Sequence, residues 1–350
     1  MSTIEARTVT PRIRPRMRDV AALAGVSVQT VSRVINGHPD VAEETRGRIQ
    51  TVIQTVGFHP NAIARSLITD SSNMLGVVAG GFQHYGPSQL LTGIEREAAG
   101  SGWQVLLQVA DVSKPDDYER IANNLIAQRV AGIVWAYPEL TGGRERAFHA
   151  KVQSVAPIIF LSMEAQSDSA VISVDNRMGA RLVVDHLIAR GRRNIGIITG
   201  PMALWSAQQR QQGWMDALQS AGRWTPDAPT SGGNWSAASG ALALHDLKAR
   251  NPNLDAVFAS NDQMALGALR AAHELGIRVP ADLAVAGFDD TPESPFFSPP
   301  LTTIHHNLET LGQLAVRELH RVVDLARASS ELPEPAPLLL QPTLVVRQST

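Results

Sequence analysis

From residue 75 onward, short apolar runs alternate with longer stretches of helical periodicity, and this alternation restricts the possible folds most strongly. A strand buried on both faces reads as an unbroken apolar run, and repeated strand–helix units build an open, doubly wound parallel sheet. The expected strands span 75–80, 103–110, 131–137, 157–162, 194–200, 256–261 and 283–290. The expected helices span 87–101, 116–128, 176–190, 206–220, 235–250 and 262–275. Because this segment is large for one sheet, we expect two similar α/β subdomains that flank a cleft.

Composition excludes several classes of protein. Hydrophobic residues make up 44% of the 350 residues and charged residues 18%, which rules out wholesale disorder. No apolar run approaches the roughly 20 residues that cross a bilayer, and the N-terminus lacks the apolar segment of a secretory signal, so we expect a cytoplasmic protein. The absence of cysteine excludes disulfides, thiolate nucleophiles and Cys-based metal sites. We expect no metal and no cofactor.

Charge is distributed unevenly along the chain. The first 60 residues carry eight Arg and five Asp or Glu, whereas the other 290 carry 23 basic and 28 acidic residues. A basic N-terminal segment on an acidic body is typical of a protein whose head binds a polyanion. A chance cluster of arginines in a disordered tail gives the same count, so charge alone does not decide between the two.

Two short helices joined by a glycine turn are predicted in the sequence RDVAALAGVSVQTVSRVING (18–37). The first has apolar residues at helical spacing and stops at Gly25. Ser27 is placed to cap the second helix, and Asn36-Gly37 ends it. Two helices of about two turns with a tight turn between them form the outline of a helix-turn-helix.

The second of these helices has two different faces. Val31, Val34 and Ile35 share an apolar face by their i, i+3, i+4 spacing, and we expect them to pack inward. Planar Gln and Arg side chains pair with the edges of adenine and guanine in the major groove, which favours DNA reading by the opposite face. A solvated polar face on an ordinary helical hairpin is the alternative. The outward residues are Val28, Gln29, Ser32 and Arg33.

A third helix is predicted in AEETRGRIQTVIQTVGF (42–58), with an apolar stripe and an end at Gly57. The next stretch, Asn61–Leu67, is too short to hold as an isolated helix in water, so it needs a partner, either a second copy of itself or DNA. Leu67 is apolar and stands at the end of this stretch. Apolar wedges are what minor-groove binders insert between base steps.

These motifs resemble the DNA-binding head of the LacI/GalR family of transcriptional regulators. The resemblance continues through the body in GPMALWSAQQRQQGW (200–214), GNWSAASG (233–240), NDQMALGALRA (261–271), GFDDTPES (287–294) and PPLTTI (299–304). It implies DNA contacts by Arg18, Ser27, Val28, Gln29, Thr30, Ser32, Arg33, Asn36, Asn61, Ala64 and Leu67. Val28 stands where the member most similar by eye has a tyrosine, which leaves the operator sequence open.

The same resemblance implies the domain organisation and the oligomeric state. One subdomain of a periplasmic-binding-protein-like body is expected to take 73–173 with 305–330, and the other 174–304 with the C-terminal strand. Only three residues come after Arg347, without the leucine-heptad helix of tetrameric members, so we expect a homodimer on palindromic double-stranded DNA. The expected parts are a flexible tail (1–15), an all-α helix-turn-helix domain (16–60), a hinge helix with its linker (61–73), and an effector-binding and dimerisation domain of two doubly wound subdomains (74–350).

Polar residues come directly after several predicted strands, at the edge where open α/β sheets bind ligands. They include Ser206, Arg210 and Asn261, with Asp289 and Asp290 after the last strand. Charged groups bind paired hydroxyls, and an indole stacks on the apolar face of a sugar ring, so these residue types favour a sugar clamp. A helix cap is the alternative for Asp290, and a surface ion pair for Arg210. The resemblance implies ligand contacts by Leu161, Ser162, Ser206, Arg210, Trp235, Asn261, Asp289 and His306.

The chain departs from the family pattern at four positions of this expected site. Ser162 stands in place of an aspartate that contacts sugar, and Leu204 in place of a small polar residue. His306 and Leu308 stand in place of a glutamine and a phenylalanine. The loss of one carboxylate leaves a galactoside, a glucoside, another disaccharide and a pentose derivative open as the ligand.

The expected function is sequence-specific repression of sugar-utilisation genes, released from a palindromic operator by a small sugar effector. A corepressor that tightens DNA binding is an alternative within the family. The chain contains no P-loop, dinucleotide-binding or zinc motif, so we expect no enzyme. A cytosolic sugar-processing enzyme that uses Asp289 or Asp290 as a base leaves the head unexplained, and a transport receptor needs a signal peptide.

Overall fold

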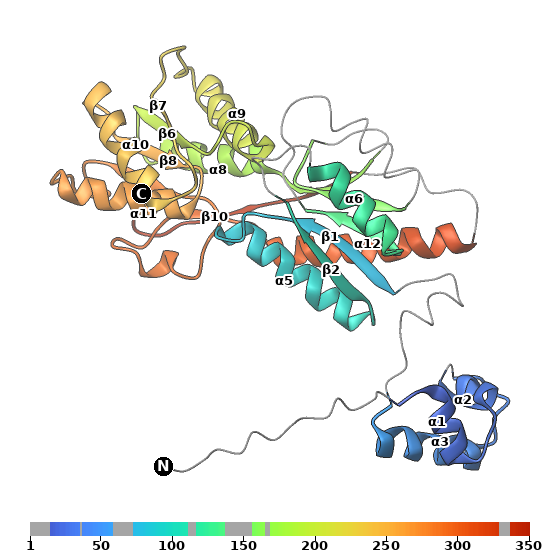
Figure 1. Cartoon of the computed structure of the whole chain (residues 1–350). Coiled ribbons are helices and arrows are strands. Elements are labelled where there is room, and N and C mark those ends of the chain that lie inside the picture. Colours follow the sequence, from blue (N-terminus) through green and yellow to red (C-terminus); the bar gives the residue numbers. More distant parts are fainter. Residues whose placement is uncertain are drawn as a thin grey trace, which may run out of the picture. The chain divides into compact units, whose positions relative to one another are not determined.

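The computed structural model describes residues 15–35, 37–58, 73–110, 117–136, 156–164, 169–328 and 337–350. The chain divides into two compact units, Met1–Ser72 and Asn73–Thr350, which we call the head and the body and describe separately (Figure 1). The expected fold class, an all-α head with an α/β body, is confirmed. Most of the predicted tail and the whole predicted hinge helix lie outside the described residues.

The head consists of three helices around a small apolar core. They are α1 (Met17–Ala24), α2 (Val28–Ile35) and α3 (Glu43–Val56). The carboxylate of Asp19 accepts a hydrogen bond from the backbone N–H of Arg16 at 2.7 Å, which satisfies a donor at the start of α1. Gly25 ends α1 with a φ of 65°, a left-handed conformation that favours glycine. The core contains Val20, Ala21, Ala24, Val31, Val34, Ile49 and Phe58.

The first subdomain of the body is built on a six-stranded parallel sheet with the order β11-β5-β4-β3-β1-β2. Among the described helices, α5 and α12 cover one face of this sheet and α6 the other. Its strands are β1 (Met74–Ala79), β2 (Gln104–Val109), β3 (Gly132–Trp135), β4 (Ile158–Leu161), β5 (Ala170–Val174) and β11 (Leu338–Leu340). Its helices are α5 (Tyr85–Gly100), α6 (Asp117–Ala127) and α12 (Leu308–Ala328).

The second subdomain is built on a four-stranded parallel sheet with the order β7-β6-β8-β9. Helices α8 and α9 pack on one face of this sheet, and α10 and α11 on the other. Its strands are β6 (Ile195–Thr199), β7 (Thr230–Gly232), β8 (Ala256–Ala259), β9 (Ala284–Ala286) and the antiparallel pair β10 (Thr303–His305) and β12 (Thr343–Val345). Its helices are α8 (Asn176–Ala189), α9 (Trp205–Ser220), α10 (Ala237–Arg250), α11 (Asp262–Glu274) and the 3₁₀ helix η1 (Ser294–Phe296).

The chain passes between the two subdomains three times, through crossovers that we name by their order in the chain. The first joins β5 to α8 (174–176), the second joins β10 to α12 (305–308), and the third joins β11 to β12 (340–343). The C-terminal strand β12 belongs to the second subdomain, as expected, where it pairs with β10. The strand before it, β11, was not predicted; it pairs with β5 in the first sheet, where Leu340 packs against the core of that subdomain.

A close approach of two helix backbones in the first subdomain gives a test of this packing. An ideal Cβ at Gly93 of α5 would lie 2.0 Å from the carbonyl oxygen of Glu309 in α12. We expect Gly93→Ala to lower the free energy of unfolding of the body by about 1–3 kcal/mol, because the backbone has to move aside. Chemical unfolding followed by tryptophan fluorescence measures it, since all six tryptophans lie in the body.

Gly100→Ala is the matched control for this substitution, since Gly100 ends the same helix and nothing lies within 4 Å of its ideal Cβ. The control is expected to be neutral or to stabilise the body by up to about 1 kcal/mol. Equal losses in both variants would contradict the close approach of α5 and α12.

Candidate functional site

The exposed face of α2 is the candidate DNA-reading surface of the head. Val28, Gln29 and Arg33 are exposed, whereas Val31 and Val34 are buried in the head core, so the two predicted faces of this helix are confirmed. Gln29 and Arg33, which point away from this core, are of the residue types that read base edges in the major groove.

The start of α2 is fixed by a local hydrogen bond. The hydroxyl oxygen of Ser27 accepts a hydrogen bond from the backbone N–H of Thr30 at 3.1 Å, which confirms the predicted cap. Arg18 is exposed on α1, and Ser32 is partly buried on α2. The remaining predicted DNA contacts lie outside the described residues: Asn36, Asn61, Ala64 and Leu67.

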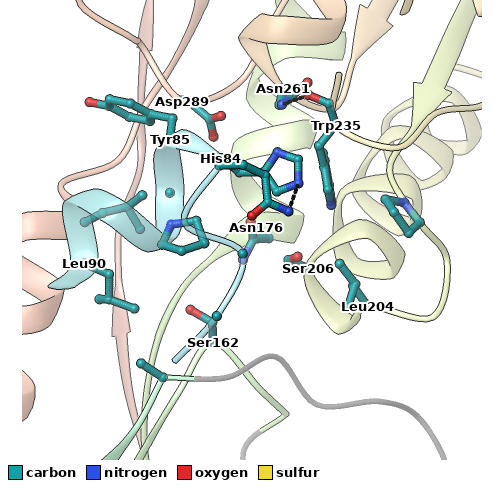
Figure 2. Close-up of a pocket in the computed structure, with 18 of the residues that line it drawn as sticks. His84, Tyr85, Leu90, Ser162, Asn176, Leu204, Ser206, Trp235, Asn261 and Asp289 are labelled. Atoms are coloured by element: carbon teal, nitrogen blue, oxygen red, sulfur yellow. Dashed lines mark hydrogen bonds between the residues drawn. The ribbon is translucent and has the colours of Figure 1, made fainter. Parts of the chain in front are cut away.

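A cavity of about 720 Å³ lies between the two subdomains of the body. Figure 2 shows side chains from both subdomains around it. Leu161, which the resemblance had placed at the ligand, does not line this cavity because it is fully buried in the core of the first subdomain. The predicted residues that do line it are Ser162, Ser206, Arg210, Trp235, Asn261, Asp289 and His306.

Most of these side chains lie in segments that follow the carboxyl ends of strands, as the alternation of strands and helices predicted. Ser162 comes directly after β4, and Asp289 lies three residues beyond β9. Asn261 caps α11 after β8, where its Oδ1 accepts the backbone N–H of Met264 at 2.9 Å. Its Nδ2 donates to the backbone carbonyl of Trp235 at 3.0 Å, and this bond joins two of the loops that line the cavity.

Arg210 is buried, so its alternative interpretation as a surface ion pair is wrong. The guanidinium Nε donates to Oδ1 of Asn176 at 2.9 Å, and Nη1 donates to the backbone carbonyl of Ser260. Nη1 also lies 3.7 Å from Oδ1 of Asp289. The guanidinium carbon lies 3.7 Å from the ring centre of Phe288, in a cation–π contact. Burial lowers the pKa of Arg210 to about 10, against the raising effect of Asp289, so the side chain stays charged.

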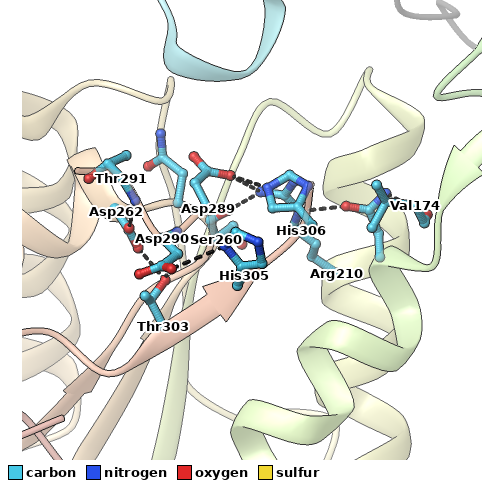
Figure 3. Close-up of polar contacts among 12 residues, drawn as sticks. Val174, Arg210, Ser260, Asp262, Asp289, Asp290, Thr291, Thr303, His305 and His306 are labelled. Carbon is cyan, nitrogen blue, oxygen red and sulfur yellow. Dashed lines mark hydrogen bonds and ion pairs between the residues drawn. The ribbon is translucent and has the colours of Figure 1, made fainter. Parts of the chain in front are cut away.

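His306 completes this buried group (Figure 3). Its Nε2 donates to Oδ1 of Asp289 at 3.0 Å, and its ring meets Phe288 edge-on with the ring centres 5.0 Å apart. Its Nδ1 is buried and has no hydrogen-bond partner among the described residues. Burial lowers the pKa of His306 despite the neighbouring carboxylate of Asp289, so we assign the neutral ring with its proton on Nε2.

Trp235 forms an aromatic wall of the cavity in a strained backbone conformation. Its φ is 70°, in the left-handed region, and the hydrogen bond from Asn261 to its carbonyl holds it there. The indole packs over Gly200, where an ideal Cβ would lie 2.1 Å from the ring. Glycine at position 200 therefore provides the space for the indole.

Asp262 joins three segments behind the cavity (Figure 3). Its carboxylate accepts the backbone N–H of Thr291 at 2.9 Å and the hydroxyls of Ser294 and Thr303, each at 2.5 Å. Burial, and next the charge of Asp289, raise the pKa of Asp262 to about 6. The sequence did not single out this residue, because a carboxylate directly after Asn261 reads as an ordinary first-turn acid of a helix.

The interpretation of Asp290 as a helix cap was wrong. Its carboxylate accepts Nη2 of Arg347 at 2.6 Å and lies 3.1 Å from Nδ1 of His305, so it ties the C-terminal segment to the loop after β9. Asp290 has a φ of 53°, which turns its side chain away from that of its neighbour. Asp289 lines the cavity, and Asp290 does not.

Sequence reasoning missed five polar residues that line the cavity: Gln83, His84, Tyr85, Asn176 and Asn234. His84 and Tyr85 lie where β1 leads into α5, and Asn176 begins α8 after β5. Partial burial lowers the pKa of His84 and raises that of Tyr85. The rule that found Asn261 was sufficient to find His84, because both come after a strand in the same way. Asn176 was hidden because β5 itself was not predicted.

Two further observations limit the kind of site. Within the described ranges, no three His, Cys, Asp or Glu residues are grouped so that they could hold a metal ion. In the same part of the chain, no helix has both the length and the apolar character needed to cross a membrane.

Comparison with known proteins identifies the family. Residues 16–61 match the family of bacterial regulatory proteins called lacI, and residues 184–350 match the periplasmic binding protein-like domain. The lactose operon repressor of Escherichia coli K12 is 36% identical over 301 residues, which cover 86% of this chain and 82% of that repressor. The chain belongs to the lacI family.

Two solved structures share the fold of this regulator over nearly its whole length. A lac repressor dimer bound to operator and the anti-inducer ONPF matches with a TM-score of 0.87 and 33% identity, covering 96% of this chain and 99% of that one. A complex of the transcriptional regulator CelR with cellobiose matches with a TM-score of 0.70 and 30% identity, covering 96% of this chain and 100% of that one. These relatives are transcriptional regulators, so the expectation that the chain is no enzyme is confirmed.

The neutral ring of His306 predicts a pH effect on the stability of the body. The unfolded chain binds a proton at this position below a pH of about 6.5, whereas Asp289, Arg210 and His305 face the native ring and burial keeps it neutral. As the pH falls from 7.5 to 5.5, the wild type is therefore expected to lose free energy of unfolding relative to His306→Gln, by up to about 1.4 kcal/mol per pH unit. Urea unfolding of both proteins at three pH values measures the difference, and a constant or growing advantage of the wild type in acid would refute the neutral ring.

Proposed function

We propose that this regulator is a repressor of sugar-utilisation genes whose homodimer binds a palindromic operator and is released by a small neutral sugar. The observation that carries the proposal is the buried pair of Arg210 and Asp289 beside the indole of Trp235, in the cavity between the subdomains. The lac repressor bound to ONPF and CelR bound to cellobiose support it as relatives.

The pair offers one donor and one acceptor to a ligand. In the described part of the chain, Nη2 of Arg210 and Oδ2 of Asp289 make no hydrogen bond, and neither is an enclosed atom. Neighbouring hydroxyls of a sugar match this arrangement, because one accepts from the guanidinium while the other donates to the carboxylate. The two charges cancel, and Arg210 is the only Arg or Lys among the described residues that line the cavity, so a neutral sugar fits better than a sugar acid.

The rest of the cavity favours a ligand larger than a monosaccharide. Its volume of about 720 Å³ lies within the range of sites that enclose drug-sized molecules. Apolar side chains of Leu90, Val109, Leu204 and Leu308 line it together with the polar group. A galactoside or another disaccharide fills this space, with one ring at the charged pair and the rest over the apolar wall. Ser162 in place of a carboxylate leaves a glucoside equally open.

The head supplies the DNA-binding half of the proposal. We assign residues 1–15 to a tail, 16–60 to the DNA-binding domain, 61–73 to the hinge and linker, and 74–350 to effector binding and dimerisation. Two heads place α2 in successive major grooves, phosphate contacts fix their register, and Asn61–Leu67 enter the minor groove between them. Both binding events take place in the cytoplasm, where the operator and the sugar are present together.

The regulatory step is a change in the relative orientation of the two subdomains. A sugar in the cavity stabilises one orientation, and affinity for the operator falls by the difference in its binding energy between the two. We favour induction over corepression because the residues of the cavity resemble those of the lac repressor. A corepressor would give the opposite sign with the same two sites.

Fluorescence anisotropy tests the whole proposal. Labelled DNA from upstream of the regulator's own gene and its neighbours is titrated at two salt concentrations, alone and with lactose, galactose, o-nitrophenyl β-galactoside, cellobiose, maltose or xylose. Tight, salt-dependent binding that one of these sugars weakens is the expected result. Tight binding that no sugar changes would refute the effector class, and the absence of specific binding would refute the assignment of the head.

Arg210→Lys serves as the site variant in this experiment. We expect it to keep operator affinity and to lose at least tenfold in sensitivity to the sugar, because lysine has no second nitrogen to bind Asn176 and Ser260 at once. Arg177→Lys on the neighbouring α8 is the matched control, since Arg177 is exposed and pairs with Asp216 outside the cavity.

A second variant tests the base-reading face of α2. Gln29→Ala is expected to weaken binding to the operator by about 5- to 150-fold, equivalent to about 1–3 kcal/mol, and to leave binding to a scrambled duplex unchanged. Gln54→Ala is the control, because Gln54 is also exposed but lies on α3. Equal losses on both duplexes would place Gln29 at a phosphate rather than at a base.

A further inference from the structure

The charged pair of the cavity is hydrogen-bonded to two of the three crossovers. Nε of Arg210 donates to Asn176, which belongs to the first crossover, at 2.9 Å. Oδ1 of Asp289 accepts from His306, which belongs to the second crossover, at 3.0 Å. Nη2 of Arg210 and Oδ2 of Asp289 are the atoms that a sugar would bind. The other polar atoms of the same side chains, Nε and Oδ1, are bonded to the crossovers.

Both crossover residues are fixed by few other contacts. Asn176 donates through Nδ2 to the carbonyl of Val174 at 3.1 Å, inside the same crossover. His306 makes a single side-chain hydrogen bond within the described part of the chain, because its Nδ1 is buried without a partner there. The orientation of the imidazole therefore depends on Asp289 and on its edge-on contact with Phe288.

The first crossover is in turn joined to the third. The backbone N–H of Asp175 donates to the carbonyl of Leu340 at 3.0 Å. A displacement at Arg210 therefore reaches two crossovers through Asn176 and its neighbour, and a displacement at Asp289 reaches the remaining one through His306.

We propose that Asn176 and His306 are positioning residues that transmit occupancy of the cavity to the crossovers, and so set how far a sugar lowers operator affinity. The proposal rests on the proposed function of the cavity and adds the route of its regulation. A sugar that draws the guanidinium and the carboxylate toward its hydroxyls moves the partners of these groups, because a buried charged group that loses its hydrogen bond is left unsatisfied. The crossovers move in turn, and the angle between the subdomains changes with them.

The two residues are suited to transmission for a further reason. The second subdomain holds Asp289 from behind through the backbone bond from its N–H to the carbonyl of Ile304, at 2.9 Å. The carboxylate end of Asp289 is therefore the part that responds to a ligand. His306 is attached to that end and not to the backbone.

The test separates sugar binding from sugar response. His306→Phe keeps an aromatic ring next to Phe288 and removes the donor to Asp289, whereas His306→Gln keeps a donor. His305→Phe is the matched control, because His305 is the adjacent residue and pairs with Asp290 instead. Sugar affinity is measured by tryptophan fluorescence, and operator affinity by anisotropy with and without each of the six sugars at saturation.

With each protein saturated by the releasing sugar, we expect the sugar to lower the operator affinity of His306→Phe less than about threefold, while the operator affinity of the sugar-free variant stays within about threefold of the wild type. His306→Gln is expected to restore the wild-type ratio and His305→Phe to leave it unchanged. Asn176→Ala, which leaves the cap by Asp175 in place, is expected to reduce the ratio in the same way. A wild-type ratio in both His306→Phe and Asn176→Ala would overturn the proposal.

Hydrogen–deuterium exchange on the sugar-free protein tests the route even if none of the six sugars releases the wild type. Backbone amides of 173–178 and 340–345 lie on the far side of Arg210 from His306 in the network, and we expect them to exchange faster in His306→Phe than in the wild type or in His305→Phe. Faster exchange with no responsive sugar would support the route and reject the effector class. Unchanged exchange in both segments would overturn the proposal independently of the sugar.

Discussion

The cavity between the subdomains depends on a buried ion pair between Arg210 and Asp289. Removing two charges from water costs several kcal/mol per ion, and only good geometry with further hydrogen bonds offsets that cost. Asn176, the carbonyl of Ser260 and the face of Phe288 provide it for the guanidinium, and His306 provides it for the carboxylate. Each of these neighbours stabilises the pair, because a buried polar group that loses one hydrogen-bond partner costs about 1–3 kcal/mol.

The position of the carboxylate depends in turn on a strained turn after β9. Asp289 and Asp290 have φ values of 126° and 53°, in a region where side chains other than glycine are strained by about 1–3 kcal/mol each. Asp262 holds this turn through Thr291 and Thr303, and Gly287 leaves room for it, since an ideal Cβ there would lie 2.2 Å from Oδ1 of Asp262. The buried carboxylate of Asp262 thus fixes the turn that places the carboxylate of Asp289 at the cavity.

Short-range patterns in the sequence predicted most of the body, whereas features that depend on distant pairing were missed. All seven expected strands exist, because buried parallel strands read as apolar runs. Strands β7 and β10 were not predicted, because each has only three residues and shows no apolar run or alternation. The stripe of Leu311, Ala315 and Leu319 was sufficient to predict α12, which was not among the expected helices. Arg210, Asn261 and Asp289 were found because they follow predicted strands, at the edge where open α/β sheets bind ligands. This rule could not show that Asp290, next in the chain, pairs with Arg347 instead.

Asp289 faces the cavity, whereas Asp290 is bonded to Arg347. In the proposed regulation, this difference lets a ligand act on Asp289 without disrupting the second subdomain. Asp290 binds Arg347 and so fastens the C-terminal segment to the loop after β9. The hydroxyl of Thr302 accepts the backbone N–H of Arg347, and the backbone N–H of Thr302 donates to the hydroxyl of Ser349. These bonds hold the loop after β9 to the C-terminal segment, and none of the residues that make them lines the cavity. In the proposed regulation, a ligand at Asp289 acts on a carboxylate whose other described side-chain hydrogen bond is to His306, in the second crossover. Because packed cores do not deform continuously, the displacement goes to the segments between the subdomains, which is where a change of orientation has to begin.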